Sequence, residues 1–120
     1  MPNITVDYSA DLDDRLDRAG LAGAVHQACV DTVAARTAAC KTRFRPAAET
    51  VVGDGAEGAH VVHIEIALLA GRTAEAKTAL TESVLALLPA HLKQPDGVHL
   101  SVEVRDLEPA YKSAVGQGGS

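Results

Sequence analysis

The chain has 120 residues, 47% of them hydrophobic, and a formal net charge of -5. This length fits one domain, the acidic balance argues against a nucleic-acid-binding protein, and no apolar stretch approaches the length needed to cross a membrane. Two tyrosines and one phenylalanine are the whole aromatic set, so the core must be built from Ala, Val, Leu and Ile. A small domain with such light core residues buries limited surface alone, which favours self-association.

The first half of the chain predicts a strand, a helix and a second strand. Residues 3–8 alternate between apolar and polar side chains, as in a half-buried strand. An acidic turn follows, in which Ser9 or Asp11 is the expected helix cap. The next apolar residues recur at helical spacing: Leu21, Val25 and Ala28. The segment 38–52 then predicts a strand in which Pro46 indicates a bulge or a sheet edge.

The second half repeats this order. Residues 60–69 form a strongly apolar strand, and a helix is expected to open near Thr73. Pro89 should end or kink that helix, because proline cannot continue the helical hydrogen bonds. Residues 98–104 alternate again and predict a last strand.

We therefore expect an α+β protein made of a duplicated β-α-β unit. The single domain would span residues 1–115, with halves at roughly 1–57 and 58–115, and residues 116–120 would be a flexible tail. Each helix is long enough to join two parallel strands, which predicts a mixed sheet of about four strands with both helices on one face. The other face needs a cover, which is a second indication of self-association.

Pro2 is the first candidate for chemistry. Removal of Met1 would leave proline as the amino terminus, and its secondary amine could act as a general base if burial or a nearby cation lowered its affinity for a proton. A strand beginning at once would hold the ring on a rigid support. The alternative is that Pro2 merely opens an edge strand.

Cationic side chains are the second candidate. Lys41, Arg43 and Arg45 alternate, so in a strand they share one face at a spacing of about 6.6 Å. Arg72 lies where a buried strand meets a helix start, a place at which open α/β sheets bind ligands, and its guanidinium suits a carboxylate. A solvated edge strand and a surface turn are the respective alternatives.

The remaining residues do not suggest a metal or redox site. His60 and His63 are three apart on an expected strand, so they point to opposite faces. Cys29 and Cys40 have no metal or redox spacing and are interpreted as free core residues in a reducing cytosol. The spacing of these residues predicts no metal site. No signal-type segment precedes the first strand, and we expect a cytoplasmic protein.

Together these residues resemble the tautomerase superfamily, and more specifically the 5-carboxymethyl-2-hydroxymuconate isomerase family. The resemblance rests on the opening "MP" with its alternating strand, the turn "YSADL", the block "HVVHIEIALLAGRTAEA" and the strand "HLSVEVRDLEPAYK". It covers nearly the whole chain. The stretch from His63 to Glu75 and the segment "EVRDLEP" are its most specific parts.

The resemblance implies a fold, an assembly and a mechanism. The fold would be the duplicated β-α-β unit, assembled as a homotrimer that needs no metal or cofactor. Pro2 would move a proton between the enol oxygen and a distant carbon of a 2-hydroxymuconate-type dicarboxylate, as in the degradation of aromatic compounds. Arg72 matches the arginine of the family's Gly-Arg turn, Lys41 stands where the family has its other arginine, and Arg43 matches a second basic position. Lysine keeps the charge but lacks the planar fork of arginine.

Two other readings fit the same sequence. Pro2 could serve a different reaction known on this fold, namely keto-enol tautomerisation, dehalogenation or decarboxylation. Alternatively the chain could be a non-catalytic trimeric scaffold, because a fold alone does not establish an activity. Since the second half starts internally, each chain can offer only one proline amine.

Overall fold

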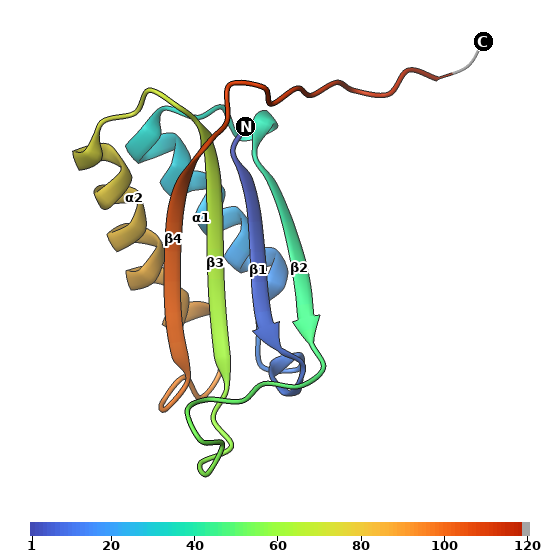
Figure 1. Cartoon of the computed structure of the whole chain (residues 1–120), viewed down its shortest axis with the longest axis vertical. Helices are drawn as coiled ribbons and strands as arrows, with labels where there is room; N and C mark the ends of the chain where they lie inside the picture. The colour runs from blue at the N-terminus through green and yellow to red at the C-terminus, as the bar shows by residue number, and fades with distance from the viewer. Residues whose placement is uncertain (119–120) are drawn as a thin grey trace.

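The computed structural model describes residues 1–118. These residues form four strands and two α-helices, and short 3-10 segments lie in three of the connections between them (Figure 1). In chain order these are β1 (Asn3–Ser9), α1 (Arg18–Val33), β2 (Lys41–Ala47), β3 (Val61–Leu69), α2 (Ala74–Leu87) and β4 (His99–Leu107). The order β-α-β occurs twice, which confirms the predicted duplicated unit.

The four strands form one mixed sheet in the order β2-β1-β3-β4. Within each half the two strands are parallel, with Asn3 opposite Lys41 in the first half and Val61 opposite His99 in the second. The halves meet where β1 and β3 pair in antiparallel fashion, with Asn3 opposite Ala67. Both helices cover the same face of the sheet, as predicted (Figure 1).

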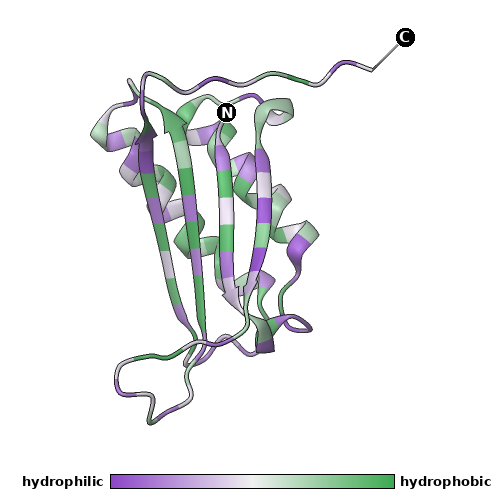
Figure 2. Ribbon diagram, turned by 45° about the vertical axis from the view of Figure 1, so that its right-hand side comes forward, coloured by the Kyte–Doolittle hydropathy of each residue, from purple (hydrophilic) through white to green (hydrophobic). Residues whose placement is uncertain are grey.

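The core lies between the helices and the sheet. Along the strands, hydrophobic and hydrophilic residues alternate, so that one set of side chains meets the helices (Figure 2). The apolar residues predicted from periodicity are buried: Ile4, Val6, Tyr8, Leu21, Val25 and Ala28. The other face carries polar side chains and has no helix against it.

The residues that cap the helices were predicted less well than the helices and strands themselves. Neither Ser9 nor Asp11 caps the first helix; Asp17 does so, because its Oδ1 accepts from the backbone N–H of Gly20 at 3.1 Å. Between β1 and α1 the chain instead makes a short 3-10 turn, Ala10–Leu12. The second helix does open as predicted, since the Thr73 hydroxyl accepts from the N–H of Ala76.

The second strand is shorter than its predicted range. It runs only over Lys41–Ala47 and lies at the sheet edge, where Pro46 is tolerated. In the expected tail, residues 119–120 lie outside the described part of the chain. Across residues 1–118, no helix combines the length and apolar character that a bilayer crossing demands.

Candidate active site

Three strand ends meet at one end of the sheet, beside the start of the chain. Because β1 is parallel to β2 and antiparallel to β3, the first residues of β1 and β2 lie next to the last residues of β3. Pro2 immediately precedes β1 at this end and is buried. The sheet register therefore brings the predicted catalytic residue to the same end as Lys41 and the turn that carries Arg72.

Lys41 is hydrogen-bonded through its backbone to Pro2, and its ammonium shares an acceptor with the Met1 amine. Its backbone N–H donates to the Pro2 carbonyl at 3.2 Å, and its Nζ donates to the carbonyl of Ala39 at 3.1 Å. The Met1 amine donates to the same Ala39 carbonyl at 2.8 Å. Burial, followed by the charge of Lys41, holds the pKa of the Met1 amine below its ordinary value. The environment at the start of the chain therefore disfavours a protonated amine.

Lys41, Arg43 and Arg45 form a stripe of alternating cations along β2, and Arg43 and Arg45 differ in whether their charge is free to bind an anion. Arg43 is exposed, and its Nη2 lies 3.5 Å from the Thr5 hydroxyl on the helix-free face. Arg45 forms a two-pronged ion pair with Asp7, with its Nε 2.9 Å from Oδ1. The Asp7 carboxylate therefore offsets the charge of Arg45, and Lys41 and Arg43 are the members of the stripe left for an anionic ligand.

Arg72 lies at the same end of the sheet but is partly engaged by the backbone. Gly71 has a φ of 119°, a value that favours glycine, and this turn carries the chain from β3 toward α2. The guanidinium donates to the carbonyl of Leu69 at 3.2 Å and to that of Val33 at 3.4 Å, so it joins the end of β3 to the end of α1. A guanidinium has five N–H donors, so further donors remain for a carboxylate.

The sequence reasoning missed one side chain at this end, Tyr111. The Asn3 side-chain N–H donates to its hydroxyl at 3.1 Å, across 108 positions of sequence. Its sequence signals were its place in the segment "HLSVEVRDLEPAYK" that carries the family resemblance and the scarcity of tyrosine in the chain. The structure thus adds a phenol next to the residue that follows Pro2.

The two cysteines are buried and free, as predicted. Burial raises the pKa of the Cys29 thiol to about 12, and burial also raises the pKa of Cys40. Both thiols therefore stay protonated at neutral pH and act as small apolar core groups. Among residues 1–118 no group of three or more metal-ligating side chains comes together.

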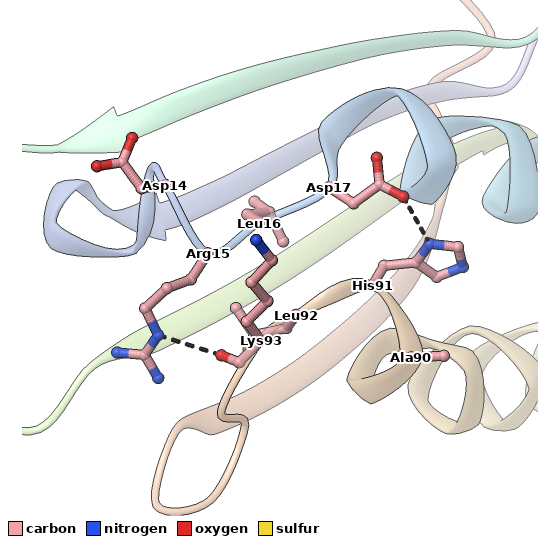
Figure 3. A pocket seen from close by; sticks show the side chains of 8 residues that line it. All are labelled: Asp14, Arg15, Leu16, Asp17, Ala90, His91, Leu92 and Lys93. Atoms are coloured by element: carbon pink, nitrogen blue, oxygen red, sulfur yellow. Dashed lines mark hydrogen bonds and ion pairs between the residues drawn. The ribbon is translucent and has the colours of Figure 1, made fainter.

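A cavity of about 500 Å³ lies at the opposite end of the molecule (Figure 3). Its walls are residues 14–17 and 90–93, which belong to different halves of the chain. Three of its charged or titratable side chains contact one another or the backbone: His91 Nδ1 lies 3.4 Å from Asp17 Oδ2, and Arg15 Nε donates to the carbonyl of Lys93. We interpret these contacts as structural contacts that hold the two halves together, because Leu16 and Leu92 also form a β-bridge there.

The fold is shared with solved enzymes. A 5-carboxymethyl-2-hydroxymuconate delta-isomerase superposes with a TM-score of 0.82 at 18% identity, over 100% of this chain and 95% of that one. A 5-carboxymethyl-2-hydroxymuconate isomerase from Deinococcus radiodurans R1 gives 0.82 at 20% identity, over 97% and 90%. A fused 4-OT symmetric trimer gives 0.75 at 26% identity, over 98% and 94%.

The comparison with family models agrees with these structures. The model described as 5-carboxymethyl-2-hydroxymuconate isomerase matches residues 2–115, nearly the whole chain. No curated protein sequence matches the chain. The match begins at Pro2 and ends beyond Tyr111, so it includes every site residue described above. The chain therefore belongs to the 5-carboxymethyl-2-hydroxymuconate isomerase family, an enzyme family of the tautomerase superfamily.

Proposed function

We propose that the chain is a cofactor-free isomerase that moves a proton within an unsaturated 2-hydroxy dicarboxylate of the 2-hydroxymuconate type. Pro2 is the proton carrier once Met1 has been removed, because in the unprocessed chain its nitrogen is a tertiary amide without a basic lone pair. Lys41, Arg43 and Arg72 bind the substrate carboxylates.

The position of Lys41 beside Pro2 carries this proposal. An amine works as a general base near neutral pH only if its protonated form is disfavoured. Two like charges about 4 Å apart at an effective dielectric of 20 repel each other by about 4 kcal/mol, which is enough to lower an amine pKa appreciably. The pKa of the Met1 amine, which lies in the same surroundings, is lowered first by burial and then by the charge of Lys41, so both causes support the proposal.

The proposed proton transfer conserves atoms and charge. The neutral Pro2 nitrogen takes the proton from the 2-hydroxyl of the dienol, and the oxygen electron pair becomes the carbonyl bond. The double bonds shift along the carbon chain, and a distant carbon takes the proton back from the Pro2 ammonium. The product is the conjugated 2-oxo isomer, and a cation near the 2-oxygen stabilises the dienolate that forms between the two steps.

The test combines intact mass with ultraviolet assays of 2-hydroxymuconate-type dienols. Active protein should lack Met1. Pro2→Ala should lower kcat about 100-fold or more, the usual contribution of a general acid-base group. Arg72→Ala should lower kcat/KM about 10-fold or more, because hydrogen bonds to charged groups contribute about 1.5–3 kcal/mol.

Controls separate chemistry from folding. Arg72 also holds the ends of β3 and α1 together, so thermal unfolding of Arg72→Ala and Arg72→Lys must be measured beside their rates. Full activity in Pro2→Ala, or in protein that retains Met1, would contradict the proposed role of Pro2. A panel that adds keto-enol, dehalogenation and decarboxylation substrates distinguishes the isomerase from the alternative Pro2-dependent reactions. An inactive result with every substrate would favour a scaffold.

The assembly that we propose is a homotrimer. Two observations support it: the polar sheet face has no helix against it, and one structurally similar protein is described as a symmetric trimer. In such an assembly the helix-free faces of the chains would meet.

A further inference from the structure

The C-terminal segment returns across the end of the sheet after β4. The N–H of Tyr111 donates to the carbonyl of Glu108 at 3.0 Å, which closes a turn directly after the last strand. From this turn the chain passes the end of the sheet close to the amino terminus, as both views show (Figures 1 and 2). The turn thereby brings a partly buried aromatic side chain to the end where Pro2 lies.

One hydrogen bond fixes where the Tyr111 hydroxyl lies. Its oxygen accepts from the side-chain Nδ2 of Asn3 at 3.1 Å. Asn3 directly follows Pro2 and pairs with Lys41 on β2 and with Ala67 on β3. The phenol oxygen therefore contacts Asn3, the residue that follows the predicted proton carrier Pro2 in the sequence. This contact lies where β1 pairs with Lys41 of β2.

The same hydrogen bond decides what the hydroxyl can do. A phenolic hydroxyl is one donor and also an acceptor. Because Asn3 donates to the oxygen, the hydrogen of the phenol has to point away from Asn3. It can then donate to a ligand, and an anionic oxygen attracted by Lys41 is the best acceptor, since hydrogen bonds to charged groups are the stronger ones.

The geometry points to Tyr111 as a further substrate-binding residue, which donates its hydroxyl hydrogen to a carboxylate oxygen of the dicarboxylate bound at the Pro2 end. Asn3 is its positioning residue. This inference rests on the proposed function for the identity of the ligand, but not on Pro2 chemistry. It also makes the C-terminal segment, rather than the sheet alone, a wall of the site.

The test uses the two tyrosines as internal reporters. Protein labelled with 3-fluorotyrosine gives fluorine NMR signals from Tyr111 and from Tyr8 only. Tyr8 is buried and donates to Asp13 Oδ1 at 2.6 Å toward the far end of β1, so it is a matched control. The probe is adipate, a saturated dicarboxylate that cannot be isomerised. We expect the Tyr111 signal to shift saturably with adipate while the Tyr8 signal stays in place.

Two variants distinguish ligand binding from a purely structural role. Tyr111→Phe keeps the ring and should weaken adipate binding, and raise KM for the dienol, about tenfold with little change in kcat. Asn3→Ala should weaken binding in the same direction, and the double variant should be no worse than Tyr111→Phe, because both act through one hydroxyl. If Tyr111→Phe lowers the unfolding temperature but leaves the adipate Kd unchanged, the hydroxyl only anchors the C-terminal segment and the inference is wrong.

This experiment can fail independently of the proposed function. Pro2-dependent turnover with an unshifted Tyr111 signal overturns the role of Tyr111 alone. A shifted Tyr111 signal, with weaker binding in Tyr111→Phe but no turnover of any dienol, overturns the isomerase and leaves the binding role in place. No saturable shift of Tyr111 at any adipate concentration overturns the inference.

Discussion

At the scale of single residues, burial and then the charge of Lys41 lower the pKa of the amine at the start of the chain. Its Nζ and the Met1 amine share the carbonyl of Ala39, and its charge contributes to the lowered pKa of that amine. A cation disfavours the protonated form of a neighbouring amine, so its removal must raise the amine pKa. The Pro2 amine, which we propose as the proton carrier, should respond in the same way after removal of Met1.

We therefore expect Lys41→Gln to move the acid limb of the kcat/KM pH profile to higher pH, because less of the Pro2 amine is then unprotonated at a given pH. Lys41→Arg keeps the charge and should leave the limb near its original position. Lys93→Gln makes the same charge change at the far end of the molecule, in the wall of the cavity, and should not move the limb. An unmoved limb in Lys41→Gln, or one displaced to lower pH, would contradict the electrostatic role.

At the scale of elements, α1 contains two glycines that differ in what surrounds them. A Cβ added at Gly23 meets no atom within 4 Å, whereas one added at Gly20 would come within 2.8 Å of the Asp17 carboxyl carbon. Asp17 is the helix cap and also contacts His91 in the second half. The two positions therefore form a matched pair within a single helix.

Gly23→Ala should stabilise the protein by about 0.5–1 kcal/mol, because alanine loses less backbone entropy in a helix. Gly20→Ala gains the same propensity but pushes the Asp17 carboxylate out of its capping position, so its net effect should be smaller or destabilising. Urea unfolding of both variants measures the difference. Equal stabilisation by the two substitutions would show that the Asp17 cap moves without cost.

Comparison of the elements with the sequence shows which strands and helix caps can be predicted from neighbouring residues. Period-two alternation located β1 and β4, and a strongly apolar run located β3, since both patterns depend only on neighbouring residues. The cap of α1 was misplaced because several acidic residues precede this helix and their sequence does not show at which of them the helix begins; in the structure it begins directly after Asp17. The Thr73 cap was easier to predict, as it directly follows the turn at Gly71.

At the scale of the whole molecule, the helix-free face of the sheet is the surface through which the proposed trimer would form. Ion pairs between strands already balance part of its charge, with Arg105 Nε 3.1 Å from Glu65 Oε1 and Arg45 bound to Asp7. Burying such a face requires that these pairs stay intact, because an unpaired buried charge is costly.

Size-exclusion chromatography with light scattering should give three times the 12.4 kDa of one chain for the wild type. Glu65→Lys leaves Arg105 beside a second positive charge and should shift the mass toward that of a single chain. Glu82→Lys makes the same charge change on the exposed side of α2 and should keep the wild-type mass. A wild type that elutes as one chain at every concentration would rule out the trimer.

The sequence by itself determined the kinds of elements, their repeated order and the buried face of each, because these follow from periodicity between near neighbours. It also singled out Pro2, Lys41, Arg43 and Arg72 as candidates. Only the tertiary structure decided that Asp7 offsets Arg45, that Arg72 joins β3 to α1, and that Tyr111 reaches Asn3. Those contacts depend on strand register and, for Tyr111, on a hydrogen bond between residues 108 positions apart, and no local pattern encodes either.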